Sequence, residues 1–353
     1  MTLKKKMVIA GVLVGISTMI GQAATLPDRI EFKSTPKLGK VTRLNLISKN
    51  VGSMKMGEVM PEQKFSQTME QELKSVCVKV NKDGTAVYEM TMPVIGMKMD
   101  AGGFKSEFHF DSSKPDNVVK IMPQTQIGKS DGFTKILSAM TKIKYTMTVD
   151  SDGKPIKVER YAESLKKALQ DQDNASAPEK AFVDMLKAMS NDDTMLDQTK
   201  SRYSIFPSTG TVRVGETWHD ETEMKMPMFN MLIQTRSDYK LVGIEEFRGR
   251  PCGKVEIKQT MKILPHKANS GQAKSIFDSF EFNVAGSDGQ GIAYLDYQNR
   301  EVVQLHQTQR MNMDITMKNI PGDNGTKLKN VPTHMQQKIT NSISIDLIEP
   351  NSP

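Results

Sequence analysis

The stretch "VVQLHQTQRMNMDITMK" (residues 302–318) alternates between two kinds of side chain over its whole length. Its apolar face carries Val303, Leu305, Met311, Met313, Ile315 and Met317, interrupted by Gln307 and Gln309. The opposite face is polar. A period of two predicts a β-strand, and 15 residues of strand span about 50 Å at roughly 3.3 Å per residue. We expect so long a strand to bend within a curved sheet that has one buried and one solvated face.

The same alternation recurs along the chain, with turn signals between the extended runs. "SVCVKV" (75–80) places Val76, Val78 and Val80 on one face, and "KVEIKQTMKIL" (254–264) does the same with its aliphatic residues. Asp-Gly pairs predict hairpins at "NKDGTA" (81–86), "DSDGKP" (150–155) and "GSDGQG" (286–291), and "DYQNRE" (296–301) is a weaker signal. The sequence therefore predicts an α+β fold, predominantly antiparallel β-meanders forming curved sheets or half-barrels.

Apolar residues at helical spacing mark the middle of the chain. They predict helices in "FTKILSAM" (133–140), "AESLKKALQ" (162–170) and "APEKAFVDMLKAMSN" (177–191). The expected organisation is an N-terminal β-rich half over residues 24–161, a helical connector over 162–203 and a C-terminal β-rich half over 204–353. Helices thus lie between two β-rich halves.

The first residues have the design of a secretory signal peptide. Lys4, Lys5 and Lys6 precede an apolar run that extends to residue 20, and "GQA" follows it. A run of about 14 residues is short for a membrane span, which needs roughly 20. We predict a signal peptide over residues 1–23, a periplasmic or secreted protein, and no transmembrane segment after cleavage.

Charge and motifs narrow the range of functions. The formal net charge of +7 is spread through sequence of mixed sign, which predicts no nucleic-acid partner. Cys77 and Cys252 are the two cysteines, and the sequence leaves open whether they form a disulfide. The chain has no nucleophile elbow, phosphate-binding loop, dinucleotide fingerprint or zinc-binding spacing. We expect no enzyme, no catalytic residues, no cofactor and no metal site.

A family resemblance begins at "FPSTGTVRVGETWHDE" (206–221). The unit from Val149 to Val158, this element and the later hairpin "GQGIAYLDYQNREVV" (289–303) follow one another in the chain in the same order as in a secreted bacterial family of unknown function, which the sequence therefore resembles. The resemblance covers most of residues 40–320, and Asn299 stands where a glycine often closes the hairpin. It implies a non-enzymatic envelope protein built on antiparallel sheets. By analogy of shape alone, it also suggests the half-barrels with covering helices that carry lipids or lipoproteins.

Methionine is the most informative residue type, with 26 in the chain. A flexible, polarizable thioether suits a surface that repacks around variable apolar partners. We therefore predict that a methionine-lined sheet face binds a lipid, an acyl chain or another apolar small molecule. The predicted binding residues are Met90, Met92, Met224, Met226, Met228, Met311 and Met313.

Two other interpretations of the same residues stay open. Thioether sulfur is a soft ligand, so M-x-M clusters in an exported protein can bind Cu(I). Alternatively, methionine fills an ordinary closed core, and the protein is a structural or interaction module of the envelope.

Overall fold

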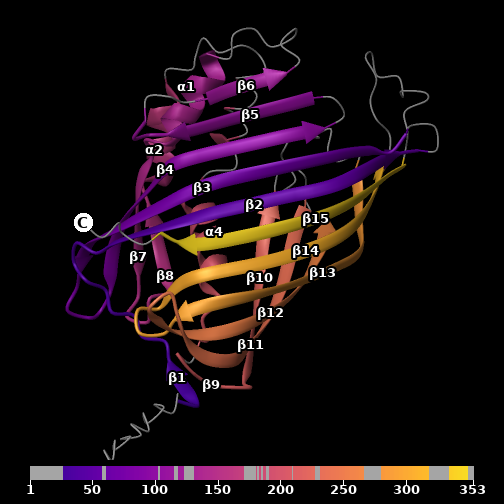
Figure 1. Cartoon of the computed structure of the whole chain (residues 1–353). Coiled ribbons are helices and arrows are strands. Elements are labelled where there is room, and N and C mark those ends of the chain that lie inside the picture. Colours follow the sequence, from indigo (N-terminus) through magenta and orange to yellow (C-terminus); the bar gives the residue numbers. More distant parts are fainter. Residues whose placement is uncertain are drawn as a thin grey trace, which may run out of the picture.

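The computed structural model describes residues 27–57, 61–101, 104–114, 118–122, 131–170, 180, 183, 186–187, 191–208, 210–226, 231–265, 280–317 and 334–348. Figure 1 shows one large curved sheet of long antiparallel strands, with helices at one end and within the curve. The predicted class, a mainly antiparallel curved sheet with few helices, is confirmed at this level. The predicted signal peptide lies outside the described residues.

The large sheet has 13 strands. From the C-terminal half come β10 (Thr217–Met226), β11 (Met231–Phe247), β12 (Arg250–Pro265), β13 (Phe280–Asp296), β14 (Glu301–Met317) and β15 (His334–Leu347). From the N-terminal half come β2 (Val41–Met56), β3 (Gln63–Val80), β4 (Ala86–Ala101), β5 (Phe104–Asp111), β6 (Val118–Met122), β7 (Lys144–Val149) and β8 (Pro155–Glu159).

These strands follow one another as β10-β11-β12-β13-β14-β15-β2-β3-β4-β5-β6, while β7 pairs with β4 and β8. The last strand, β15, therefore lies beside the first long strand, β2, and Leu46 is directly opposite Ile345. This pairing makes one continuous sheet of the two β-rich halves. Separately, β1 (Arg29–Glu31) pairs with β9 (Thr211–Arg213). The predicted boundaries between halves and connector remain a prediction.

The turn predictions were correct at three of the four positions. Gly84 and Gly153 take φ values of +86° and +79° in the β3–β4 and β7–β8 turns. The "DYQNRE" hairpin joins β13 to β14, and its left-handed residue is Arg300 (φ 51°) rather than Asn299. The hairpin predicted at "GSDGQG" (286–291) is wrong, because β13 runs through it.

The glycines of that segment serve close packing rather than a turn. A Cβ on Gly291 would lie 2.6 Å from the carbonyl oxygen of His306 on β14, and Gly291 has no positive φ. A Cβ on Gly289 would meet the Gln259 side chain at 3.0 Å. The absence of side chains there allows the curved strands to approach one another.

Three helices are described with bounds: α1 (Asp131–Met140), α2 (Tyr161–Ala168) and α4 (Asp192–Tyr203). The first two confirm the helices predicted at 133–140 and 162–170. The helix predicted at 177–191 lies mostly outside the described residues, although Val183 and Leu186 are helical.

Two hydrophobic clusters hold these elements together. One packs α1 and α2 against β4 and β7, with Ile136, Tyr145 and Leu165 buried in it. The other joins the β1–β9 pair to β11, β12, β13 and β14 through Phe32, Leu241 and other buried residues. Tyr203, at the end of α4, packs against both clusters. The helix end therefore lies where the two clusters meet.

Candidate functional site

The sheet has an inner face, which we define by the odd-numbered residues of β14. Residues directly opposite one another in an antiparallel ladder point to the same side. Starting from Gln307, the strand register therefore identifies the residue of each neighbouring strand that lies on the inner face. The resulting row is Trp218, Tyr239, Ile257, Gly291, Gln307, Ile343, Ser48 and Met69.

Helix α4 lies over this inner face and is anchored at both ends. At its start, the Asn191 side chain accepts a hydrogen bond from the Thr194 backbone at 2.7 Å, as N-capping residues do. The Asp192 carboxylate accepts from the backbone N–H groups of Arg160 (3.1 Å) and Ala162 (2.9 Å), which ties α4 to the start of α2. Beyond its end, the Ser204 and Tyr239 hydroxyls lie 3.2 Å apart.

A cavity of about 320 Å³ lies between the end of α4 and the inner face. Its apolar lining comes from six strands and includes Leu46, Met69, Ile257, Leu305, Ile343, Ile345 and Tyr239. Its polar lining includes Ser237, Gln259, Gln307 and Arg202. A pocket of this size lies within the range of about 300–1,000 Å³ typical of small-molecule sites.

Three polar residues of the lining that belong to the sheet are already hydrogen-bonded to one another. The Gln307 amide donates to Gln259 Oε1 at 2.7 Å, and the Gln259 amide donates to Ser237 Oγ at 3.0 Å. Next to this chain, the Gln309 amide donates to Ser287 Oγ at 3.1 Å. Amides that are hydrogen-bonded to one another lose fewer hydrogen bonds to water when an apolar molecule covers them. This row is therefore compatible with an apolar ligand and forms a polar edge of the cavity.

A smaller cavity of about 130 Å³ adjoins the first. Leu46, Ile345 and Arg202 line both cavities. The smaller one is also lined by Met90, Met147, Tyr88, Tyr145, Tyr203, Arg300 and Glu301. Burial raises the pKa of Tyr145 to about 12 and also raises the pKa of Tyr203, so both phenols keep their protons near neutral pH.

Two arginines line the smaller cavity. Burial lowers the pKa of Arg202 and of Arg300, against the opposing effect of neighbouring tyrosines and, for Arg300, of Asp152 and Asp150. The Arg300 side chain donates to the Phe32 carbonyl at 3.1 Å and stacks over Phe206, while its buried Nε has no partner among the described residues.

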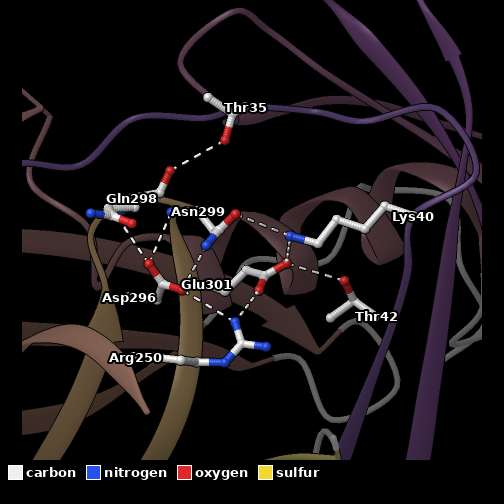
Figure 2. A network of polar contacts seen from close by, with 8 residues as sticks. All are labelled: Thr35, Lys40, Thr42, Arg250, Asp296, Gln298, Asn299 and Glu301. Atoms are coloured by element: carbon white, nitrogen blue, oxygen red, sulfur yellow. Dashed lines mark hydrogen bonds and ion pairs between the residues drawn. The ribbon is translucent and has the colours of Figure 1, made fainter. Parts of the chain in front are cut away.

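A polar network closes the end of the sheet next to this cavity (Figure 2). Arg250 Nη1 lies 3.2 Å from Asp296 Oδ2 and 3.1 Å from Glu301 Oε2. Lys40 Nζ lies 2.7 Å from Glu301 Oε1, and Asp296 accepts the backbone N–H of Asn299 at 3.0 Å. Because both carboxylates are held by cations and by N–H donors, the network fixes the β13–β14 turn against β12 and the segment before β2.

The structure places the side chains of four of the seven methionines predicted to form one site, and these four lie in two different regions. Met92 is buried in the cluster under the helices, and Met90, also buried there, lines the smaller cavity. Met311 and Met313 lie half-buried on the inner face, toward the opposite end of β14. The other three cannot be placed as side chains: Met224 and Met226 belong to β10 with undescribed side chains, and Met228 lies outside the described residues.

The apolar residues that line the larger cavity are mostly leucine and isoleucine, and the methionine pattern missed them. Leu305 and Gln307 belong to the alternation at 302–318, so their face was predictable. Arg202 had no comparable signal, because its position depends on where α4 lies over the sheet.

Nucleophile and metal chemistry have little support in the described part of the chain. Cys77 and Cys252 are both buried and free, and burial with the nearby Asp296 raises the pKa of the Cys252 thiol to about 12. No three His, Cys, Asp or Glu side chains among the described residues are grouped as a metal site would need. No helix in the same residues has the length and apolar composition needed to span a membrane.

Comparisons with known proteins agree with the resemblance found in the sequence. A family described as "Family of unknown function (DUF6263)" matches residues 83–250. That segment contains the Val149–Val158 unit and the VGETW element, so the resemblance to an uncharacterised family is confirmed. No curated protein matches the chain by sequence.

Among solved structures, the similarities are distant. A lipovitellin structure, titled for its lipid–protein interactions, is 10% identical with a TM-score of 0.37 over 90% of this chain, which spans 26% of that chain. A putative exported protein with a YmcC-like fold from Bacteroides fragilis is 10% identical with a TM-score of 0.22, over 90% of this chain and 100% of that one. A DUF1329 family protein from Desulfovibrio piger is 9% identical with a TM-score of 0.12, over 87% of each chain. Scores this low carry no argument about function.

Proposed function

We propose that this protein is an exported, non-enzymatic protein of the bacterial envelope that binds a lipid or another molecule with an acyl chain. The ligand occupies the cavity between α4 and the inner face of the sheet. The observation that carries the proposal is this cavity of about 320 Å³, whose walls include Leu46, Ile257, Leu305 and Ile343. Transfer of an acyl chain to such walls gains roughly 0.8 kcal/mol for each buried CH₂ group.

The non-enzymatic part of the proposal rests on the polar groups near the cavity. The glutamines and Ser237 are engaged with one another, and the carboxylates of Asp296 and Glu301 are engaged with Arg250. A general base has to reach a substrate proton within hydrogen-bond distance, and these groups already have other partners. Export is supported by the signal-peptide design of residues 1–23.

Saturable binding of a fluorescent fatty acid tests the proposal, with cavity-filling variants as the comparison. Ile343→Trp places a large ring at the wall of the cavity and is expected to weaken binding at least tenfold. The matched control, Val51→Trp, adds the same ring at a residue that is 44% exposed and lines neither cavity. It is expected to bind like wild type. The proposal would be contradicted if wild type showed no saturable binding, or if both variants bound the fatty acid with equal affinity.

One observation favours a second candidate, Cu(I) binding. Three neighbouring strands place half-buried methionines on the inner face at the end remote from the helices: Met311 and Met313 of β14, Met335 of β15 and Met54 of β2. Thioethers on adjacent strands suit a soft cation. The affinity for Cu(I), measured by competition against a chelator, should then be lower in the double variant Met311→Leu/Met313→Leu than in wild type. Equal affinities of the two proteins would exclude the site.

A further inference from the structure

Arg202 places a positive charge inside the site. Its side chain retains exposed surface, but it lines both cavities, so the surface that it exposes faces the hollow of the curved sheet. Burial lowers its pKa. None of the described residues ion-pairs with or hydrogen-bonds to its guanidinium. A guanidinium with no anion beside it leaves its charge and its N–H donors uncompensated, and so the site favours a molecule that brings an anion.

The smaller cavity around Arg202 is rich in hydrogen-bond donors. The phenols of Tyr88, Tyr145 and Tyr203 line it, and their pKa values are raised, so they remain donors at neutral pH. No hydrogen bond joins these hydroxyls to other described residues. Arg300, only 6% exposed, adds a second guanidinium whose Nε has no partner in the described part of the chain.

The carboxylate in the same lining does not neutralise these donors. Glu301 already contacts Lys40 at 2.7 Å and Arg250 at 3.1 Å. The remaining lining is hydroxyl, amide or apolar, including Thr42, Asn299 and Leu44. The smaller cavity therefore contains two guanidinium groups and three phenol donors. Its one carboxylate is already ion-paired with Lys40 and Arg250.

We propose that the ligand is a long-chain carboxylate, with its headgroup at Arg202 in the smaller cavity and its tail in the larger one. This inference rests on the proposed function. The two cavities share Leu46, Ile345 and Arg202, so head and tail sites are continuous. A planar guanidinium can donate two parallel hydrogen bonds to a carboxylate. The tyrosine hydroxyls can donate further hydrogen bonds to the same carboxylate.

The test compares palmitate with hexadecanol, which has the same chain length and no charge, by titration calorimetry at neutral pH. Wild type is expected to bind palmitate at least tenfold more tightly, since hydrogen bonds between a guanidinium and a carboxylate are roughly twice as strong as hydrogen bonds between neutral groups. Arg202→Met should remove this preference, leave hexadecanol binding unchanged and keep the thermal midpoint. Arg202→Lys should restore part of the preference.

Arg213→Met is the matched control, because it removes one positive charge from an exposed position that lines neither cavity. It should bind both ligands like wild type. Equal affinity of wild type for palmitate and hexadecanol overturns the headgroup assignment while leaving the proposed function intact. An equal loss of both ligands in Arg202→Met overturns it as well. Failure of wild type to bind either ligand removes the proposed function itself, and the wild-type comparison needs no variant to fold.

Discussion

The ammonium group of Lys40 lies 2.7 Å from Oε1 of Glu301, across the junction of the two β-rich halves. Lys40 comes directly before β2, and Glu301 begins β14. Oε2 of the same carboxylate contacts Arg250 at the start of β12. One side chain thereby joins three segments at the closed end of the sheet, next to the smaller cavity, and holds the walls of the site at a fixed spacing.

Glu301→Ala should lower the free energy of unfolding by about 2–4 kcal/mol, because it removes the carboxylate from two largely buried cations. Urea unfolding measures this. Glu31→Ala, which breaks an ion pair with both side chains more than half exposed, should cost less than about 0.5 kcal/mol. Similar losses in the two variants would contradict a structural role for the network.

Glycines of β13 should differ sharply in their tolerance of a methyl group. Gly291→Ala places Cβ 2.6 Å from the His306 carbonyl and should cost about 1–3 kcal/mol. Gly286→Ala meets no atom within 4 Å and has no positive φ, so its free energy of unfolding should change by less than about 0.5 kcal/mol. Thermal unfolding of the pair checks this, and a destabilised Gly286→Ala would restore the turn interpretation of 286–291.

The thiol of Cys252 should be inert in the native protein. With a pKa of about 12, only about one molecule in ten thousand carries the reactive thiolate at pH 8. A thiol reagent should therefore modify Cys252 at pH 8 only after denaturant is added. Rapid labelling of native protein would show that this end of the sheet opens.

The same shift gives a pH dependence with a definite sign. The folded thiol has a pKa of about 12, above the ordinary value of 9.0, so unfolding releases its proton once the pH exceeds 9. The contribution of the protonated thiol to the free energy of unfolding is therefore fully present below pH 9 and is lost as the pH rises from 9 to 12. The decline in that interval should be smaller in Cys252→Ala than in wild type, as followed by urea unfolding at each pH.

Asp192 should control how firmly α4 covers the cavity. Asp192→Ala removes the acceptor for two backbone N–H groups at the start of α2 and should destabilise the protein by about 1–2 kcal/mol. Hydrogen exchange in α4 should increase as well. Asp193→Ala, at an exposed neighbouring position without a side-chain hydrogen bond to the described residues, should change neither property. Equal exchange in the two variants would contradict the anchoring role.

Much of the sheet was predictable from alternation, because period two reports which side of a strand is buried. The odd residues of β14 face inward as the sequence indicated. Alternation alone does not say which apolar set is inside, however. In β3, Cys77 is 1% exposed, whereas Val78 and Val80 are 46% and 42% exposed. These valines share the outer face of the sheet with Val41, which pairs with Val76 and is 47% exposed.

The site was less predictable than the sheet, because it depends on contacts between distant segments. The pairing of β15 with β2 brings Ile345 beside Leu46, and no local pattern encodes that neighbour. Arg202 lies in a short polar helix, where an arginine ordinarily faces solvent. Only the curvature of the sheet around α4 turns this arginine toward the cavities.

Quenching of Trp218, the one tryptophan of the chain, tests the central claim most directly. Its ring stacks on Tyr239 with centroids 5.6 Å apart, and Tyr239 lines the larger cavity. A fatty acid with a spin label on its tail should quench Trp218 fluorescence in a saturable way, and unlabelled palmitate should reverse the quenching. Saturable binding of the labelled fatty acid without any quenching of Trp218 would place the ligand elsewhere and contradict the account.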